Sequence, residues 1–514
     1  MDADLPATET ELKLRVPPEA LRRLSAHPLL RGGAPPVAKK LHSIYFDTPD
    51  FDLWRQGVAL RVRRDGRRWV QAVKGGGTVR GGLHQRMEIE TEVAGPFPDC
   101  TRITDERLAG IFASPGLRAQ LRPVFVTTVN RRSRVLELES GAVVEASIDR
   151  GEIRSGDASD AVCEIELELK SGPASQLFEF ALKLLDGISL HIENRSKAER
   201  GLALARGERP APVKAGTVAL ARDMTVSDAF RTVAWAALRH LQSNEQGVLE
   251  GSDHEYLHQM RVALRRLRSA FRVFGAAVPA GSIEPLATEF KWLADRLGPA
   301  RDWDVFMTET LPPIRETFAG HAALARFVKE CVRLHRAAVR KARRAVASAR
   351  YQRLMLETAA WLAGEKWHGG QDEPAREVLA RSATEFASSV LKERYAQVRK
   401  RGRKLKQRSA AELHRLRISV KKFRYAADFF AMLFDPKGGR GMLSHLARLQ
   451  NILGAMNDAA TAEVLMRGAV HAKSDRALSE ARGIVLGWSQ GRALTLRREL
   501  LTAWKAFRAA EKFW

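Results

Sequence analysis

The chain lacks several features that would fix its class at once. No run in its 514 residues approaches the roughly eighteen consecutive apolar residues of a membrane-spanning helix. Its start, Met-Asp-Ala-Asp, is acidic and without a hydrophobic stretch, unlike a secretory signal. The cysteines Cys100, Cys163 and Cys331 lie far apart, cannot all pair, and lack metal-ligand spacing. A cytoplasmic location without a membrane partner is therefore expected.

Positive charge, by contrast, is abundant and unevenly distributed. Residues 1–210 hold 32 Lys and Arg against 30 Asp and Glu, whereas residues 211–514 hold 53 against 30. Nearly all of the formal net charge of +25 therefore lies in the second part. This asymmetry indicates a polyanionic partner there, and composition leaves nucleic acid, an anionic membrane and polyphosphate open.

The first part has the periodicity of strands. Period-two alternation or β-forming residues mark residues 9–16, 59–63, 69–74, 85–93, 124–138, 142–149 and 162–170. Short helices are expected at 18–26, 105–109 and 174–185, with turns at Asp65-Gly66, Gly75-Gly76-Gly77 and Gly151. Many antiparallel strands with few helices predict a barrel or a sandwich.

Amphipathic helices follow a short proline-rich stretch at residues 209–213. From Asp223 onward the apolar residues recur with the period of a helix, which is typical of a helical bundle. We predict a first domain over residues 1–208, a linker at 209–220 and a helical domain over 221–514.

The helical part contains an internal duplication. Residues 257–268 match 413–424, and residues 293–302 match 449–458, both at an offset of 156 residues. Equal offsets in two separate blocks argue against chance similarity. Two copies of one helical unit are expected, with cores at about residues 250–306 and 406–465.

Charged side chains of both signs share faces on the predicted strands. Alternation groups them as Glu9, Glu11 and Lys13; Arg61 and Arg63; Glu88, Glu90 and Glu92; and Glu164, Glu166 and Glu168. A solvated face explains any one strand well. Repetition on so many strands favours a closed sheet whose tunnel binds a hard cation through carboxylates and phosphate through Lys and Arg.

Other common phosphate and catalytic motifs are missing. Gly75-Gly76-Gly77 lacks the Lys and Ser or Thr of a P-loop and does not lead into a helix, so a hairpin turn is predicted. Neither a Cys/His pair nor a Ser/His/Asp arrangement is visible. In the predicted tunnel, a metal held by carboxylates can lower the pKa of bound water and create a nucleophile.

An ordered set of motifs resembles the CYTH family, the triphosphate tunnel metalloenzymes. It opens with Glu9-Thr-Glu-Leu-Lys13 and continues through residues 45–49, 59–63, 74, 86–90, 149–151, 164–168 and 196–201. The resemblance covers about residues 5–206. It implies an eight-stranded antiparallel barrel open at both ends, with Mg²⁺ or Mn²⁺ as cofactor.

The resemblance also implies roles for the matched residues. Metal would be held by Glu9, Glu11, Glu164 and Glu166. Phosphate would be bound by Lys13, Arg61, Arg63, Lys74, Arg86, Arg131 and Lys197. The catalytic set would be Glu9, Glu11, Lys13, Glu88, Glu90 and Asp149, of which the last three complete the acidic side and help place water. Where the family has one substrate arginine, this chain has Arg131-Arg132-Ser133-Arg134. Arg131 is favoured, although a bulge or register slip would substitute Arg132.

Basic stripes mark the duplicated helices. The spacing 3, 4, 3, 4 aligns His258, Arg261, Arg265, Arg268 and Arg272; the second copy aligns His414, Arg417, Lys421 and Arg424, and Arg266 and Lys422 flank the stripes. A solvated basic face is the plain alternative. Like charges at this spacing repel, so each stripe costs helix stability unless an anion compensates it. Duplication of the stripe therefore favours a bound linear polyanion, to which protonated histidines would donate hydrogen bonds.

The stripes resemble the CHAD domain, whose tandem helical repeats open with His-x-x-Arg. The match covers about residues 221–514 and is firm for the two repeat cores. CHAD domains are associated with inorganic polyphosphate and frequently follow CYTH domains, which is the order here. Nucleic acid is less favoured as a partner, because the stripes carry little aromatic interleaving for base stacking.

These resemblances predict metal-dependent hydrolysis of inorganic triphosphate to pyrophosphate and phosphate, with the helical domain binding polyphosphate. Thiamine triphosphatase and adenylate cyclase activities occur on the same barrel, so thiamine triphosphate and nucleotides are alternative substrates. A non-catalytic polyphosphate-binding adaptor is the alternative from a different class.

Overall fold

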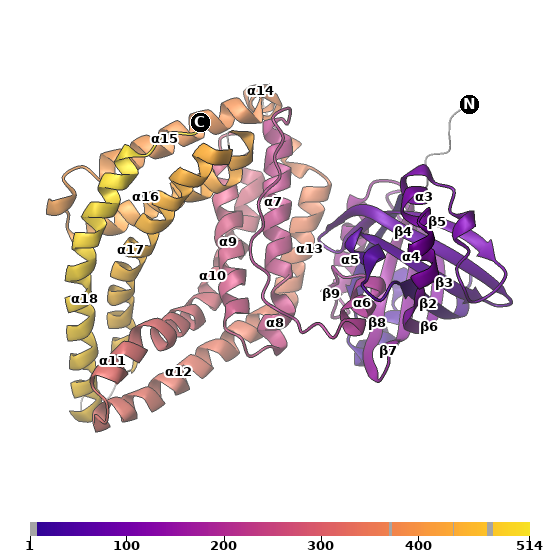
Figure 1. Ribbon diagram of the computed structural model, residues 1–514, viewed down its shortest axis with the longest axis horizontal. Coiled ribbons are helices and arrows are strands. Elements are labelled where there is room, and N and C mark those ends of the chain that lie inside the picture. The colour runs from indigo at the N-terminus through magenta and orange to yellow at the C-terminus, as the bar shows by residue number, and fades with distance from the viewer. Residues whose placement is uncertain (1–7, 370–372, 435, 470–475) are drawn as a thin grey trace. The chain divides into compact units, whose positions relative to one another are not determined.

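The computed structural model describes residues 8–369, 373–434, 436–469 and 476–514, which form two compact units (Figure 1). One unit contains the chain up to Ala211 together with Ala349–Glu365, and the other contains Pro212–Ser348 and Lys366–Trp514.

A closed antiparallel barrel forms the centre of the first unit. Its strands are β1 (Thr8–Arg15), β2 (Val37–Asp47), β3 (Val58–Asp65), β4 (Arg68–Arg80), β5 (Leu83–Val93), β6 (Arg122–Glu137), β7 (Val143–Ser155) and β8 (Ala158–Ser171). They pair in the order β5-β4-β3-β2-β6-β7-β8-β1, and β1 also pairs with β5, which closes the cycle. The short β9 (His191–Ile192) pairs with β1. The expected eight-stranded barrel is thus confirmed.

The apolar faces of the strands point outward and are covered by helices. On β1, Leu12 and Leu14 are fully buried on the outer side, because Glu11 and Lys13 alternate with them and line the interior. Helix α5 (Ser175–Leu185) covers β1 and β8, and α13 (Ala349–Ala363) packs on α5. The other helices of this unit are α1 (Leu21–Ser25), α2 (Asp52–Arg55), α3 (Glu106–Phe112), α4 (Pro115–Gln120) and α6 (Lys197–Ala205).

Two glycine segments differ from their predictions. Gly75-Gly76-Gly77 lies inside β4 as a bulge, where the register to β5 shifts, so the predicted hairpin turn is wrong. A Cβ on Gly77 would lie 2.1 Å from the carbonyl oxygen of Gln85, so the glycine permits this close strand approach. Gly151 likewise lies within β7 instead of a turn. A Cβ on Gly151 would be 2.0 Å from the carbonyl oxygen of Thr128.

The second unit is helical. Its helices are α7 (Val226–Gln242), α8 (Glu245–Glu250), α9 (Glu255–Val273), α10 (Ala280–Val305), α11 (Leu311–Thr317), α12 (Ala322–Val346), α14 (Glu373–Ala380), α15 (Ala383–Arg401), α16 (Ala410–Phe430), α17 (Pro436–Ala469) and α18 (Arg476–Ala509). A π-helical turn, Phe306–Thr310, joins α10 to α11.

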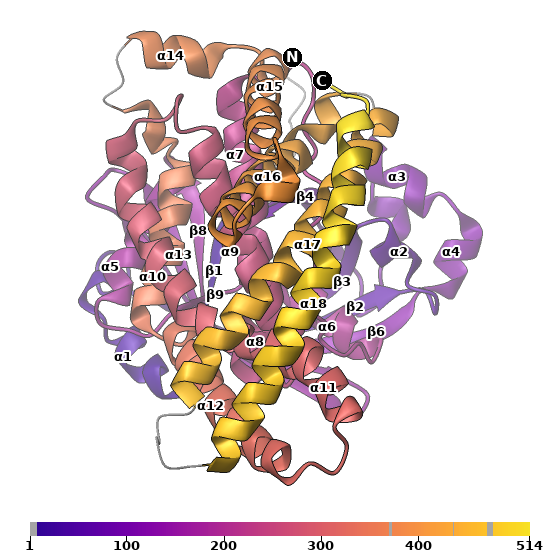
Figure 2. The same ribbon diagram turned by 90° about the vertical axis from the view of Figure 1, so that its left-hand side faces the viewer.

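The duplication extends over four helices per copy. Helices α7, α9, α10 and α12 begin at residues 226, 255, 280 and 322, and α15, α16, α17 and α18 begin at 383, 410, 436 and 476. Each shift lies within two residues of the offset of 156 in the sequence. The packing repeats as well, since consecutive members of each set pack together; Figure 2 shows α17 alongside α18.

Candidate active site

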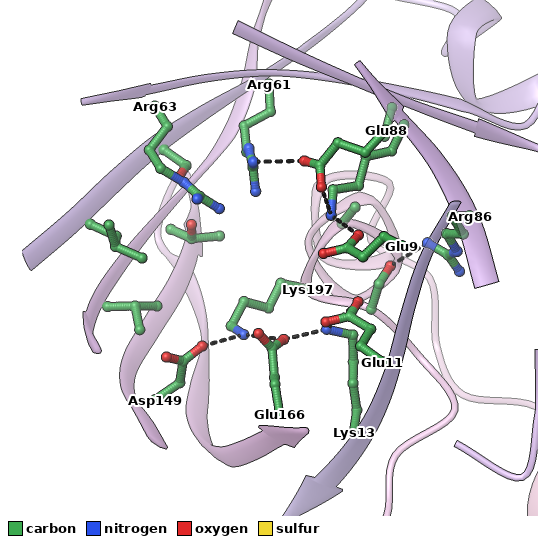
Figure 3. Close-up of a pocket in the computed structure, with 18 of the residues that line it drawn as sticks. Glu9, Glu11, Lys13, Arg61, Arg63, Arg86, Glu88, Asp149, Glu166 and Lys197 are labelled. Carbon is green, nitrogen blue, oxygen red and sulfur yellow. Dashed lines mark hydrogen bonds and ion pairs between the residues drawn. The ribbon is translucent and has the colours of Figure 1, made fainter. Parts of the chain in front are cut away.

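Charged side chains line a cavity of about 310 Å³ inside the barrel (Figure 3). Strand alternation brings them there, because every second residue of a barrel strand faces the interior. The lining includes every residue predicted to be catalytic or substrate-binding: Glu9, Glu11, Lys13, Arg61, Arg63, Lys74, Arg86, Glu88, Glu90, Arg131, Asp149 and Lys197. Glu166 lines it too, and Glu164 contacts it through an ion pair with Lys197.

Three buried carboxylates meet at one wall of the cavity. Asp149 on β7 lies opposite Glu164 on β8, and Glu166 follows two residues later. Oxygens of all three lie within 4.8 Å of one another. Lys197 Nζ, at the start of α6, is 2.7 Å from Asp149 Oδ2 and 2.9 Å from Glu166 Oε1. The ammonium group therefore lies among the carboxylates, where a hard cation with oxygen ligands would fit.

Burial and neighbouring cations shift the pKa values of these carboxyls in different directions. Burial raises the pKa of Glu166, but Lys13, Lys197 and Arg131 outweigh it and hold that pKa well below its usual range. Burial also opposes ionisation of Asp149, whose pKa is nevertheless lowered. For Glu164 burial prevails and its pKa is raised. Glu164 is therefore the carboxyl of the three that most readily holds a proton.

Lys13 connects β1 to the same wall. Its Nζ is 2.7 Å from Glu11 Oε1 and also pairs with Glu166 (Figure 3). Burial lowers the pKa of Lys13, but the Glu11 and Glu166 carboxylates raise it overall. Lys13 thus stays charged inside the cavity.

The pleat of β6 directs the arginines at 131, 132 and 134 to different environments. Arg131 lines the cavity and donates to both oxygens of Asp149, at 2.8 and 2.7 Å. Arg132 is exposed on the other face, and Arg134 donates to the Leu30 carbonyl at 2.9 Å. Among the three, only Arg131 is in the cavity lining.

The opposite wall pairs cations from β3 and β4 with carboxylates. Arg61 Nη2 is 3.1 Å from Glu88 Oε1 and 3.1 Å from Glu90 Oε1. Lys74 Nζ is 2.6 Å from Glu9 Oε2 and 2.9 Å from Glu88 Oε2. Glu9 is therefore held by Lys74 and is not one of the three clustered carboxylates.

Arg63 differs from the other cations of the cavity. Its Nε donates to Ser43 Oγ at 3.3 Å, and no carboxylate among the described residues forms an ion pair with it. Burial lowers its pKa to about 10, with Arg61 and Arg131 adding repulsion. Arg63 is thus a part-buried cation without a carboxylate in ion-pair contact among the described residues, which suits an anion bound in the cavity.

Helix α6 is fixed at the cavity by its first turn. Ser196 and Glu199 form a capping box, and Arg86 donates to Ser196 Oγ at 3.2 Å and to Glu199 Oε2 at 2.9 Å. This turn carries Lys197 to the carboxylate wall. Arg86, predicted to bind substrate, therefore also holds α6 in place.

Sequence reasoning missed the role of Arg200. This side chain is only 5% exposed, donates to Asp160 Oδ2 at 2.9 Å, and contacts Glu164 Oε2 at 3.4 Å. Arg200 therefore helps to hold the Glu164 carboxylate in position. Arg200 follows Lys197 by three residues on a helix, and side chains at this spacing lie on the same face. This spacing could have indicated from the sequence that Arg200 lies near the cavity.

The basic stripes of the helical unit face each other across packed helices. Helix α9 packs on α16. Burial lowers the pKa of Lys421 to about 7, together with repulsion from Arg417 in its own stripe and Arg265 in the other. The Nε atoms of Arg265 and Arg417 are buried without a hydrogen-bond partner among the described residues. Four of these cations thus share one small region: Arg261, Arg265, Arg417 and Lys421.

The other predicted polyphosphate ligands vary in environment. Burial lowers the pKa of His258 to about 4, while His414 is exposed with Nδ1 2.9 Å from Asn457 Oδ1. Arg266 is buried, 5.5 Å from the centroid of the Phe429 ring, so it packs within the helical core. The remaining members, part-buried or exposed, are Arg268, Arg272, Lys422 and Arg424.

Comparison with known families accounts for both halves. The CYTH domain matches residues 7–202, and the CHAD domain matches residues 232–467. The crystal structure of the CHAD domain from the plant Ricinus communis is 32% identical, with a TM-score of 0.51, and covers 59% of this chain and 99% of its own. The chain carries an N-terminal CYTH domain and a C-terminal CHAD domain.

Two curated proteins show further similarity. An inorganic triphosphatase of Haemophilus influenzae is 32% identical over 165 residues, which is 32% of this chain and 46% of that protein. The match thus spans less than half the length of that relative. An uncharacterised protein of Mycobacterium tuberculosis is 25% identical over 427 residues, 76% of this chain and 75% of its own. The barrel is therefore similar to the CYTH family and, over part of its length, to a triphosphatase.

None of the helices in the described ranges combines the length and the apolar character that crossing a membrane requires.

Proposed function

We propose that the CYTH domain hydrolyses inorganic triphosphate to pyrophosphate and phosphate with Mg²⁺ or Mn²⁺, and that the CHAD domain binds inorganic polyphosphate. The observation that carries the first part is Arg63, a part-buried cation with no carboxylate in ion-pair contact among the described residues, opposite three clustered carboxylates. A cavity with an uncompensated cation on one wall and clustered acids on another suits a metal-bound phosphate chain.

The cations would bind the phosphate chain and stabilise its charge. Arg63 is free to donate from its guanidinium, whereas Arg61 and Lys74 must share their charge with Glu88. Negative charge that develops on the transferring phosphoryl group would be stabilised by the same groups, which are held in place before reaction. Lys13 and Lys197 would contribute from the other wall.

Asp149, Glu164 and Glu166 fit a hard divalent cation, which when bound would activate water and polarise phosphate oxygens. Lys197 Nζ would have to move away from these carboxylates to admit the cation. Glu9 and Glu11 remain proposed ligands, and both would first have to leave their lysine partners. In hydrolysis the oxygen of water bonds to the terminal phosphorus, the bridging P–O bond breaks, and a carboxylate on the acidic wall accepts the proton of the water.

Phosphorus NMR of the full chain with tripolyphosphate and Mg²⁺ tests this reaction. Pyrophosphate and phosphate should appear in equal amounts. Arg63→Ala should lose most of the activity, while Arg64→Ala, whose side chain lies on the outer face of the same strand and is exposed, should retain it. Equal activity in both variants would overturn the assignment of Arg63.

The polyphosphate proposal rests on the facing stripes of α9 and α16. Cations held together with buried, unpartnered N–H groups favour an anion that spans both helices. We expect the full chain to bind long-chain polyphosphate and Arg265→Glu/Lys421→Glu to lose most of that affinity. The control Lys392→Glu/Arg415→Glu, at exposed positions outside the stripes, removes the same charge. Equal losses in both double variants would indicate only non-specific attraction by net charge.

A non-catalytic polyphosphate adaptor remains the second candidate, favoured by the net charge of the helical region. It predicts polyphosphate binding without metal-dependent hydrolysis of any triphosphate.

A further inference from the structure

A second cavity, of about 260 Å³, lies within the helical unit. The segment from α8 to the start of α9 forms one side, and the end of α10 and one face of α12 form the rest. None of the basic-stripe residues lines it. Its charged groups therefore have no part in the polyphosphate proposal.

Asp304 provides a buried hydrogen-bond acceptor in this cavity. Its side chain is 3% exposed, and Oδ1 lies 2.7 Å from His335 Nε2. Oδ2 is buried without a hydrogen-bond partner among the described residues. Because such an atom costs free energy unless it is hydrogen-bonded, Oδ2 calls for an N–H or O–H donor. The π-helical turn Phe306–Thr310 begins two residues later, and turns of this kind are frequent at functional sites.

Arginines on one face of α12 supply positive charge. Arg336, Arg340 and Arg343 follow at helical spacing and all line the cavity. Arg343 donates to the carbonyl oxygens of Val248 at 3.0 Å and Gly251 at 2.5 Å, which fixes the loop after α8. Arg336 and Arg340 are exposed, and neither has an ion-pair partner in the described part of the chain. They are therefore available to an anion at the edge of the cavity.

The remaining wall is apolar and tightly shaped. Val248, Leu257 and Val339 line it. A Cβ on Gly247 would lie 2.0 Å from the Tyr256 ring, so α8 packs against α9 without room for a side chain at this position. The cavity thus offers an apolar wall, a buried acceptor and two guanidinium groups without an ion-pair partner among the described residues.

The two copies of the repeat differ here. The offset of 156 residues places Ala410 opposite His254 and Ala460 opposite Asp304. Ala460 is exposed, whereas Asp304 is buried. The second copy therefore keeps the basic stripe but has alanine at these two positions, so the Asp304 part of the cavity is not a by-product of the repeat itself.

We propose that this cavity binds a nucleoside monophosphate. The phosphate pairs with Arg336 and Arg340, an N–H or O–H group of the nucleoside donates to Asp304 Oδ2, and the ring packs on the apolar wall. Inorganic phosphate fits poorly, because it would face the Asp304 carboxylate and leave the apolar wall empty. A metal is disfavoured too, since the cluster of three potential ligands found among the described residues lies in the barrel.

Calorimetric titration of the full chain with AMP tests this, with adenosine and inorganic phosphate as separate titrants. AMP should bind at least tenfold more tightly than either, because only AMP engages both ends of the cavity. Arg336→Gln/Arg340→Gln should weaken AMP binding by about tenfold or more. The control Lys341→Gln/Arg344→Gln removes the same charge from exposed positions of α12 that do not line the cavity, and should bind normally.

The barrel also attracts phosphate, so Arg63→Ala is titrated in parallel. AMP affinity that is unchanged in Arg63→Ala and reduced in Arg336→Gln/Arg340→Gln supports the proposal. Loss of AMP binding in Arg63→Ala with none in the α12 double variant would overturn it, because AMP would then occupy the barrel. Absent AMP binding, or phosphate binding as tightly as AMP, would overturn it as well.

Discussion

Replacing Arg63 by alanine should damage activity and stabilise the protein at the same time. The side chain of Arg63 is part-buried, lies near Arg61 and Arg131, and among the described residues has only Ser43 as a hydrogen-bond partner. Its pKa is lowered to about 10. A lowering of this size corresponds to a penalty on the charged form of on the order of 3 kcal/mol.

The sign of the effect follows from linkage. A base whose pKa is lowered on folding destabilises the folded protein wherever it is charged, which for Arg63 means below about pH 10. Arg63→Ala removes that penalty and loses some packing of the aliphatic stem, which leaves a gain of about 1–2 kcal/mol. The melting temperature of the barrel should rise by a few degrees at pH 7. The difference should shrink above pH 10.

Activity should change in the opposite direction. A preorganised cation that meets charge in the transition state contributes about a hundredfold to a thousandfold in rate. We therefore expect kcat/KM for tripolyphosphate to fall by about that factor in Arg63→Ala. Arg61→Ala should lose activity and stability together, because it leaves Glu90 without its cation and Glu88 with Lys74 alone.

Phosphate release and thermal unfolding of the same preparations check this prediction, with Arg64→Ala as the control. Near-normal kcat/KM in Arg63→Ala, or a loss of stability as large as that of Arg61→Ala, would refute the view that Arg63 is an uncompensated cation kept for substrate.

Three further predictions concern both domains. Glu166→Gln should lower metal-dependent turnover by about a hundredfold or more without unfolding, whereas Glu139→Gln, at an exposed position, should not; near-normal turnover in Glu166→Gln would contradict the metal assignment. Polyphosphate binding should weaken as pH rises through about 7, because Lys421 loses its proton there, and Lys421→Arg should flatten this profile; an equally steep profile in that variant would exclude Lys421 as the source. Binding should also weaken steeply with salt, as polyanion binding releases counterions, and affinity independent of salt would argue against contacts with the phosphate chain.

The barrel interior was predictable because strand alternation is strict. Once Glu9, Glu11 and Lys13 are placed on one face, the closed sheet brings them to the same cavity as Arg61 and Arg63. Strand alternation does not predict which charged side chains contact one another inside the cavity. The clustering of Asp149 with Glu164 and Glu166 depends on the register of β7 on β8, and Lys197 reaches them from a helix far along the chain.

Local sequence patterns gave wrong or missing predictions where the structure depends on tertiary contacts. Gly77 reads as a turn residue but serves a bulge, because the strand beside it comes too close for a side chain. Strand β2 escaped the period-two pattern, since its first four residues, Val37–Lys40, are all exposed and lack an apolar face. The second cavity was equally hidden, because Asp304, His335 and Arg340 meet only through the packing of α10 on α12.

Metal-dependent phosphate release by the purified full chain is the most direct test of the proposed function. The substrates to compare are tripolyphosphate, ATP, thiamine triphosphate and long-chain polyphosphate, each with Mg²⁺ and with a chelator, and Glu166→Gln serves as the inactive control. We predict rapid release from tripolyphosphate that requires Mg²⁺ and is lost in Glu166→Gln. A folded protein that binds polyphosphate but releases no phosphate from any of the four substrates would contradict the enzyme proposal and leave the adaptor in its place.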